Sequence, residues 1–342
     1  MYRWLLLVLV LLGAGPVRSE VVQGLYAATV PVPDQSEQSL QQGAAAALAE
    51  VVVKVSGSES ALQNPAVTAA LGQARKQVQQ FVFSRDAADG GLRAKFEFNR
   101  AFVTELVKEA GLPLWTANRP RVLLWVVAEA EGKQFFVNPA ETGDLAGALA
   151  QAFQHRGIPA GFPLFDLGDT AAVSLGDIWN LDIPRVEAAS LRYGVEDILV
   201  GRVVESSSGR WVGDWTYLHA GEQRLGGGDA PDAQAFFQRG VGLVAEDMVA
   251  RYAVAASAGP EGQLRLGITG VNSFADYASI VNWLEELELV EQAQLDKIDG
   301  ERMELTIEAA VDAPRLAQLL QLNRRLQPVN PAATDLEYQW QN

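Results

Sequence analysis

The sequence predicts a mixed fold, α/β and α+β, made of three small modules, the last of which is a ferredoxin-like βαββαβ unit. Three observations predict it. Segments with apolar residues every three or four positions alternate with segments of alternating or continuous apolar residues, as helices and strands do. The order strand, helix, strand in the middle of the chain is typical of an α/β sheet. A length of 342 residues is enough for two or three domains.

The first 19 residues have the composition of a removable export signal. Arg3 gives a positive start, Leu5–Leu12 is an apolar core of signal length, and Val17–Ser19 is a small-residue site before Glu20. The apolar run is shorter than the roughly 20 residues of a membrane-spanning helix. No cysteine follows, which excludes a lipid anchor of the bacterial lipoprotein type. We therefore expect an exported protein without stable membrane insertion.

The composition excludes several classes of function. The formal charge is −15 at pH 7, and it becomes −17 once Arg3 and Arg18 leave with the signal. Such an acidic chain repels nucleic acid and anionic membrane surfaces. The lack of cysteine excludes disulfides, thiolate catalysis and Cys-ligated zinc, and two histidines are too few for a three-histidine metal site. We expect no metal, no cofactor and no nucleic acid partner.

An amino-terminal α+β domain is predicted over residues 20–117. Gly24–Val32 is predicted as a strand. The helix that follows has a buried face of regularly spaced apolar residues, namely Leu40, Ala44, Leu48, Val51 and Val55. Residues 92–98 alternate strictly between apolar and charged side chains, which is typical of a half-buried strand. Asn99 then caps a further helix.

An α/β domain is predicted over residues 118–255. Val122–Val127 is a continuous apolar run, typical of a strand that is covered on both faces, and Ile198–Val200 is predicted as a second central strand. Helices lie between the two, one of which ends at Gly157. Strands that alternate with helices predict a sheet with helices on its faces.

A hairpin and a long helix complete this domain. Trp211–His219 and Glu222–Leu225 are predicted as antiparallel strands. Gly226–Gly228 is predicted as a flexible turn that leads into a helix over Asp232–Tyr252. A glycine-rich loop before a helix can also bind anions, but this one lacks the lysine and hydroxyl residue of a phosphate loop, so we expect a turn.

The third domain, residues 262–342, follows a hinge predicted at residues 255–260. Apolar residues alternate in a first strand, a helix follows, and a hairpin turns at Asp299-Gly300. A second helix and a last strand, Leu336–Trp340, complete the order β-α-β-β-α-β. This order defines the split ferredoxin-like unit.

Three short motifs carry a family resemblance, namely Leu25–Val30, Val53–Gly57 and Arg121–Trp125. Through them most of the mature chain resembles an uncharacterised family of exported Gram-negative bacterial proteins, the domain-of-unknown-function 2066 family. The resemblance implies a periplasmic location in a Gram-negative cell envelope. The motifs are structural, so they imply no chemistry.

The segment Tyr193–Val203 resembles a strand found in several envelope accessory domains. These include the amino-terminal domain of the Tol-Pal translocation protein and the curli-secretion assembly family. That resemblance implies a non-enzymatic adaptor that binds protein partners in the envelope.

The Trp211 hairpin supplies candidate contact residues. In an extended strand, Trp211, Trp215, Tyr217 and His219 project to one face. One interpretation is an aromatic platform for a glycan or an extended peptide. The other is that this face packs under the helix over Asp232–Tyr252, because large aromatic residues at strand spacing usually belong to cores. Exposure of the four side chains distinguishes the two.

Other residue patterns do not define a site. Four carboxylates in one loop could bind calcium, but their spacing matches no EF-hand, so a solvated loop with helix caps is expected at Asp166, Asp169, Asp177 and Asp182. No Gly-x-Ser-x-Gly motif is present, and no pair of acidic residues stands out as a glycosidase pair. His155 is expected near a helix end, where it interacts with the helix dipole. No catalytic residue is predicted.

The last strand is a candidate edge for pairing with a partner chain, and Tyr338 and Trp340 are its candidate contact residues. Taken together, the sequence predicts a non-enzymatic periplasmic adaptor or accessory factor of an envelope assembly or transport system. The alternative is a peptidoglycan or glycan binding module that uses the aromatic hairpin.

Overall fold

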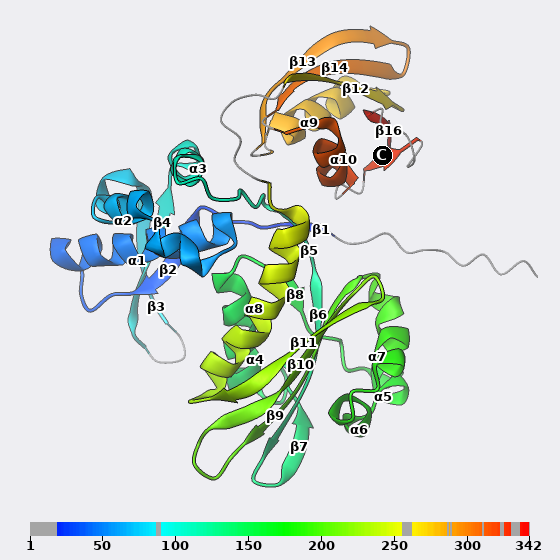
Figure 1. The fold of residues 1–342 in the computed structure, drawn as a ribbon. Helices are drawn as coiled ribbons and strands as arrows, with labels where there is room; N and C mark the ends of the chain where they lie inside the picture. The colour runs from blue at the N-terminus through cyan, green and yellow to red at the C-terminus, as the bar shows by residue number, and fades with distance from the viewer. Residues whose placement is uncertain are drawn as a thin grey trace, which may run out of the picture.

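The computed structural model describes residues 19–86, 90–254, 262–285, 287, 289–309, 311–321, 325–329 and 336–341. Residues 1–18 of the predicted signal and the predicted hinge at residues 255–260 lie outside the described residues. The described chain combines helices with several small sheets (Figure 1), which confirms the predicted mixed fold class.

The first domain packs a long helix on a small antiparallel sheet. The sheet has the order β2-β4-β3, with β2 at Ala27–Pro31, β4 at Leu92–Phe98 and β3 at Val78–Arg85. The helices are α1 (Glu37–Ser56), α2 (Pro65–Leu71) and α3 (Arg100–Glu109), with short 3-10 turns at Glu59–Gln63 and Ala74–Gln77. The predicted apolar face of α1 is buried against this sheet. Strand β3 was not predicted, because its side chains are mostly exposed and show no alternation.

The middle domain is a three-layer α/β sandwich. Its six-stranded sheet has the order β11-β10-β9-β6-β7, and β8 also pairs with β6. Its strands are β6 (Val122–Ala130), β7 (Lys133–Phe136), β8 (Ala160–Gly161), β9 (Asp197–Glu205), β10 (Trp211–His219) and β11 (Glu222–Ala230). Strands β6 and β9 are parallel and form the centre, as their apolar sequences predicted.

Helices cover both faces of this sheet (Figure 1). One face packs against α4 (Gly143–His155) and α8 (Ala233–Tyr252). The other face packs against the shorter helices α5 (Leu167–Ala172), α6 (Leu175–Trp179) and α7 (Ile183–Ser190), the last continued by a 3-10 turn at Leu191–Tyr193. Alternate residues of β6 enter the two cores, as strand geometry requires.

The third domain contains the six predicted elements, with one further strand before the last. The predicted elements are β12 (Gly262–Thr269), α9 (Phe274–Glu285), β13 (Val290–Asp299), β14 (Arg302–Ala309), α10 (Ala313–Gln321) and β16 (Leu336–Trp340). The sheet order is β13-β14-β12-β16-β15, and β15 (Leu326–Pro328) is an addition that the sequence pattern did not reveal. Because β15 reverses the chain before β16, β16 pairs with β12 in parallel, where a ferredoxin-like unit has an antiparallel pair.

One element of the middle domain differs from its prediction. Gly226–Gly228 is not a turn but the centre of β11, and each glycine pairs with a residue of β10. At Gly227 a Cβ would lie 2.7 Å from the backbone oxygen of Gly213, and Gly228 has a φ of +130°, so neither position accommodates another residue without strain. The turn prediction was wrong because these glycines serve close strand packing.

A buried arginine joins the first domain to the middle domain. Arg119 has no exposed surface, and it lies in β5 (Asn118–Pro120), which pairs with β1 (Ser19–Val21). Its guanidinium group donates to the carbonyl oxygens of Lys54 at 2.7 Å, Arg156 at 3.1 Å and Gly157 at 2.8 Å. Lys54 lies in the last turn of α1, and the other two follow α4.

The end of each helix leaves carbonyl groups without partners and carries partial negative charge. Arg119 therefore neutralises the ends of two helices that belong to different domains. Two further carbonyl oxygens accept from the same group, Thr116 at 2.8 Å and Trp115 at 2.9 Å, and the guanidinium carbon lies 3.7 Å from the centre of the Trp115 ring. Five backbone acceptors thus gather on one side chain at the junction.

We predict that Arg119→Met lowers the free energy of unfolding by about 3 kcal/mol, because it leaves several buried carbonyl groups without donors. Urea unfolding followed by tryptophan fluorescence measures the change. Arg185→Met, which removes an exposed arginine of α7, is the matched control and should change the value by less than about 0.5 kcal/mol. Equal, small effects of both substitutions would contradict the assigned role of Arg119.

Candidate functional site

The aromatic face of the Trp211 hairpin packs in the core. Trp211, Trp215 and Tyr217 are all buried, and the Trp215 ring stacks on Phe236 of α8 at 5.1 Å between ring centres. Glycines at positions 201 and 240 make room for this ring, since a Cβ at either position would collide with it. The sequence left two interpretations open, an exposed aromatic platform and packing under a helix. The structure shows the second, with the aromatic side chains packed under α8.

His219 belongs to a cluster of polar groups at the end of the same strand. Its Nδ1 lies 2.9 Å from Oδ1 of Asp197, a buried carboxylate that also accepts from the hydroxyl of Tyr217. Arg251 of α8 donates to the same hydroxyl at 2.7 Å. The pKa of Tyr217 lies well above its usual range, mainly because the side chain is buried and secondly because Asp197 is negatively charged. The cluster ties β9 and β10 to α8.

The two candidate residues of the last strand are also buried. Strand β16 lies between β12 and β15, so the expectation that it forms an open edge was wrong. Trp340 Nε1 donates to Asp276 at 3.3 Å, and the Tyr338 hydroxyl donates to the carbonyl of Ala317 at 3.4 Å. Both side chains hold the strand to the helices of the third domain. The short strand β15 covers the edge that the sequence left open.

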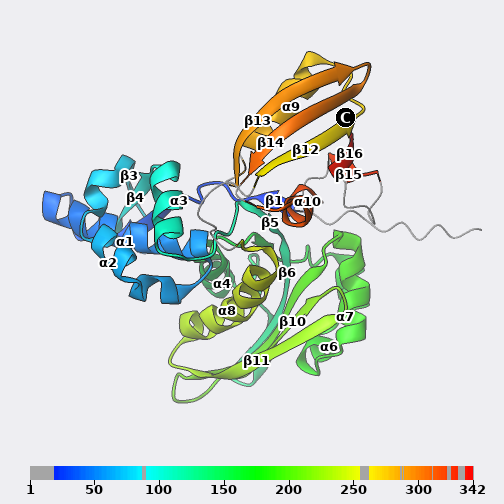
Figure 2. The ribbon, with the colours of Figure 1, turned by 45° about the horizontal axis from the view of Figure 1, so that its top comes forward.

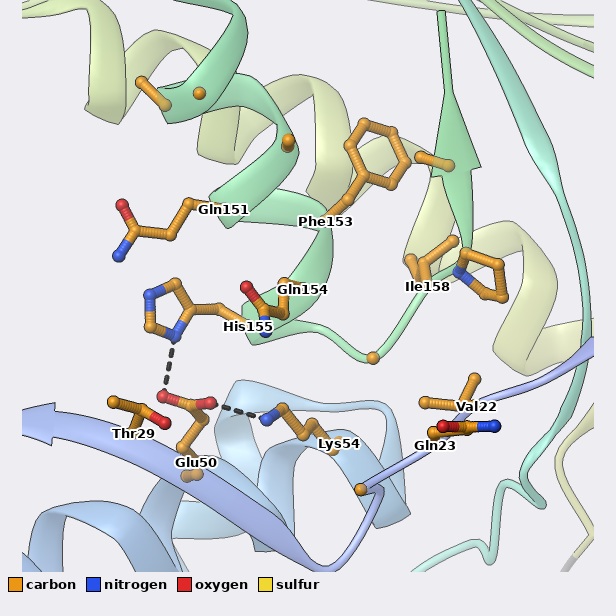
Figure 3. Close-up of a pocket in the computed structure, with 18 of the residues that line it drawn as sticks. Val22, Gln23, Thr29, Glu50, Lys54, Gln151, Phe153, Gln154, His155 and Ile158 are labelled. Atoms are coloured by element: carbon orange, nitrogen blue, oxygen red, sulfur yellow. Dashed lines mark hydrogen bonds and ion pairs between the residues drawn. The ribbon is translucent and has the colours of Figure 1, made fainter. Parts of the chain in front are cut away.

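A cleft of about 1280 Å³ lies between the first and middle domains (Figure 3). Strands β2 and β4 and helix α1 line one wall, and α4 with residues 157–162 lines the other. Gly143 and Gly147, on successive turns of α4, border the cleft, and a Cβ at either position would meet no atom within 4 Å. Backbone of α4 is therefore accessible along this wall.

A contact between His155 and Glu50, supported by Lys54, connects the two walls. His155, the last residue of α4, places Nδ1 2.6 Å from Oε2 of Glu50 on α1. The other oxygen of Glu50 lies 2.6 Å from Nζ of Lys54, one turn further along α1, and Lys54 also donates to the carbonyl of Ala27 at 3.0 Å. Figure 3 shows the two contacts of Glu50, with His155 and with Lys54.

The surroundings of Glu50 favour its charged form. Burial alone would raise the pKa of this carboxyl group, but the hydrogen bond from His155 and the charge of Lys54 outweigh it, and the pKa lies below its usual value. Glu50 is thus a carboxylate near neutral pH and accepts a hydrogen bond from Nδ1 of His155. Nε2 is then the ring nitrogen that remains for a bound group.

The charged part of the lining is less acidic than the chain as a whole. Four cationic side chains line the cleft, namely Lys54, Arg93, Lys95 and Arg121, against three carboxylates, namely Glu50, Asp86 and Asp144. This is close to balance in a chain of charge −15. Together with Thr29, Gln151 and Gln154, these groups can form hydrogen bonds and ion pairs with the backbone and side chains of a bound polypeptide.

Sequence reasoning located His155 but not its partner. His155 lies at the end of a helix, as predicted. Its partner Glu50 is 105 residues earlier in the chain and belongs to another domain. Glu50 has no local signal, because acidic residues at this spacing from a lysine are common on helix surfaces. Only the packing of α1 against α4 brings the two together.

The middle domain also exposes three leucines, Leu164, Leu167 and Leu191, with exposed fractions of 72, 89 and 79 %. The two segments that carry them are held together, since Arg192 binds both oxygens of Asp166 at 2.7 and 2.8 Å and the Tyr193 hydroxyl accepts from the backbone of Leu164 at 2.9 Å. Of the four acids expected in a solvated loop, Asp166, Asp177 and Asp182 cap helices as predicted. Asp169 is buried instead, and it accepts hydrogen bonds from Arg192 and Tyr193.

Among the described residues, no group of three or more His, Cys, Asp or Glu side chains has a metal-binding arrangement. In the same part of the chain, no helix combines the length and the apolar character that a membrane crossing requires.

The fold and the cleft define a multi-domain protein of mixed α/β and α+β class, with a polar groove between two of its domains. Comparison with protein families gives a match to the first domain: the family described as Domain of unknown function (DUF8605) matches residues 19–116. The match covers less than a third of the 342 residues and attaches no activity to the cleft. A comparison with curated proteins gives no match.

We predict that Glu50→Gln destabilises the protein by about 2 kcal/mol near neutral pH, because hydrogen bonds to a charged group are lost. The pKa of Glu50 is lower in the folded than in the unfolded state, so its stabilisation is present above the unfolded value and disappears as the pH falls through the folded value. The difference from the unsubstituted chain should therefore narrow below about pH 4.5.

Urea unfolding at a series of pH values from 3 to 7 measures this difference. Glu109→Gln, at the exposed end of α3, is the matched control for the loss of a carboxylate and should change the free energy of unfolding by less than about 0.5 kcal/mol. A difference for Glu50→Gln that stays constant over this range would contradict the assigned ionisation.

Proposed function

We propose that this chain is a non-enzymatic, exported adaptor or accessory factor of the periplasm, which binds a segment of a protein partner in an envelope assembly or transport system. The observation that carries the proposal is the cleft between the first and middle domains. Its volume of about 1280 Å³ exceeds the roughly 300–1,000 Å³ of most small-molecule pockets. A stretch of polypeptide fits such a groove better than a metabolite does.

The chemistry of the walls supports a polypeptide as the bound group. One wall offers the cationic Lys95 and Arg93 of β4, and the other offers the amides of Gln151 and Gln154. A peptide presents backbone donors and acceptors at every residue, which amide and imidazole groups can bind. The nearly balanced charge of the walls favours a neutral or mildly acidic segment over a basic one.

The Glu50–His155 pair is assigned to binding. A histidine that activates a nucleophile is hydrogen-bonded to that nucleophile on one side and to an orienting acid on the other. Glu50 occupies the acid position, and in the part of the chain that the structure describes no hydroxyl group is hydrogen-bonded to the ring of His155. Nε2 is therefore left to contact the bound segment.

Export and protein binding have support outside the cleft. Residues 1–19 have the composition of an export signal. Three exposed leucines, on two segments joined by the Asp166–Arg192 contact, offer apolar groups to a protein partner. An aromatic platform for a glycan has no such support at the hairpin, because Trp211, Trp215 and Tyr217 are buried.

We predict that a photocrosslinking amino acid at Gln151 or Lys95 captures the same protein partner in living cells. The two positions lie on opposite walls of the cleft, so one bound segment can reach both. Lys133, an exposed residue of β7 outside the cleft lining, is the control position. Mass spectrometry identifies the attached protein.

Crosslinks from the two cleft positions to one envelope protein, with none from Lys133, are the expected result. Folded variants that give no crosslinked protein from either cleft position would overturn the proposal. Equal crosslinking from Lys133 would show that the capture does not depend on the cleft.

A further inference from the structure

Strand β11 forms an open edge of the sheet in the middle domain. It pairs with β10 over all nine residues, from Ala230 opposite Trp211 to Glu222 opposite His219, with no shift of register. Its other side pairs with no described strand. In an antiparallel strand alternate residues point their N–H and C=O groups away from the paired neighbour, so β11 presents a row of unpaired backbone groups.

The other edge strands have bulges, prolines or short lengths that β11 lacks, although β11 has charged side chains. Strand β13 has two register shifts and β3 has one, and such bulges disturb pairing with a further strand. Strands β2 and β15 are short and end in proline, at Pro31 and Pro328, and β7 has four residues. Among the described sheets, β11 has the longest uninterrupted edge. Natural proteins rarely leave such an edge exposed without a use for it.

The glycines of β11 leave side chains of α8 uncovered beside this edge. Helix α8 runs along the same border of the sheet (Figure 2). A Cβ at Gly226 would lie 3.3 Å from Leu243 of α8, and a Cβ at Gly228 would lie 2.9 Å from Nη1 of Arg239. Because both positions lack side chains, Leu243 stays partly exposed and Arg239 exposed. Gly226 and Gly228 are two residues apart and share a face.

Arg239 differs in its charge pairing from the other arginines at the border between β11 and α8. Arg224 forms an ion pair with Asp247 of α8, and Arg210 forms one with Asp229. Arg239 has no ion pair within 4 Å among the described residues, although it interacts at longer range with Asp229. This border therefore presents an apolar group and a positive charge, at a spacing that matches two alternate residues of an extended chain.

We propose that β11 is a strand-addition site for an extended segment of a partner protein. The added strand places an apolar residue against Leu243, beside Gly226, and an acidic residue two positions away against Arg239, beside Gly228. Backbone hydrogen bonds to the edge supply affinity and the two side chains supply selectivity. This inference extends the proposed protein-binding function to a second site outside the cleft.

A second copy of this chain fits the border between β11 and α8 less well than such a segment. In antiparallel pairing of two β11 strands, the residues that face α8 come from Glu222, Arg224, Gly226, Gly228 and Ala230. None of these is a large apolar residue that could cover Leu243. The chain also carries a charge of −15, which opposes self-association.

Selection from a phage-displayed library of ten-residue random peptides tests the proposal, with the full chain as bait. We expect enriched peptides to carry an apolar residue two positions from Asp or Glu. With Arg239→Glu as bait, the enriched peptides should carry Lys or Arg in place of the acid. Arg185→Glu on α7, a charge reversal at another exposed arginine, is the matched control and should leave the selected pattern unchanged.

Hydrogen exchange locates the binding of an enriched peptide. Slower exchange of β11 amides, with no change in β13, is expected. The proposal is overturned if no peptide is enriched, if the pattern does not change with residue 239, or if protection falls on the cleft instead. Protection of β11 without peptide, in a chain that sediments as a dimer, would identify a second copy as the occupant and also overturn it. Crosslinking from Gln151 is independent of β11, so failure here leaves the cleft proposal to its own test.

Discussion

The junction at Arg119 is the contact on which the arrangement of the first two domains depends. A guanidinium group without exposed surface donates to the carbonyl ends of α1 and α4 and stacks on Trp115. Burial of a charge is costly unless its donors are satisfied, and five backbone carbonyl oxygens satisfy them here. The geometry of these acceptors is fixed by two helices, so the angle between the domains is fixed with them.

The cleft follows from this junction. Glu50 and Lys54 lie in the last two turns of α1, and His155 is the last residue of α4, so the residues that connect the walls come from the same helix ends that Arg119 binds. Beyond the junction the walls diverge and leave polar side chains and helix backbone accessible. A rigid groove reduces the entropy that a bound segment and its receptor must lose together. The open edge at β11 lies in the same middle domain but is formed by different elements.

Much of the fold could be predicted from sequence, whereas little of either site could. The alternation in Leu92–Phe98 and the apolar run in Val122–Val127 predicted strands correctly, because side-chain periodicity reports burial directly. The Gly226–Gly228 segment was wrongly predicted as a turn, because glycine is common in turns. In the structure, glycine is required there because the neighbouring strand leaves no room for a side chain. The pairing of Glu50 with His155 spans 105 residues and two domains, and no local pattern encodes it.

The cleft requires a fixed orientation of the first domain relative to the middle domain. The chain has no cysteine, so spin labels can be attached at Lys95→Cys and Asp144→Cys, on opposite walls of the cleft, without background labelling. Pulsed electron–electron spin resonance then measures the distance between the two labels. A single narrow distance distribution that broadens when Arg119→Met is added is the predicted result. A broad distribution in the doubly labelled chain with Arg119 intact would show that the two walls have no fixed separation. It would contradict both the preformed cleft and the role of Arg119 at the junction.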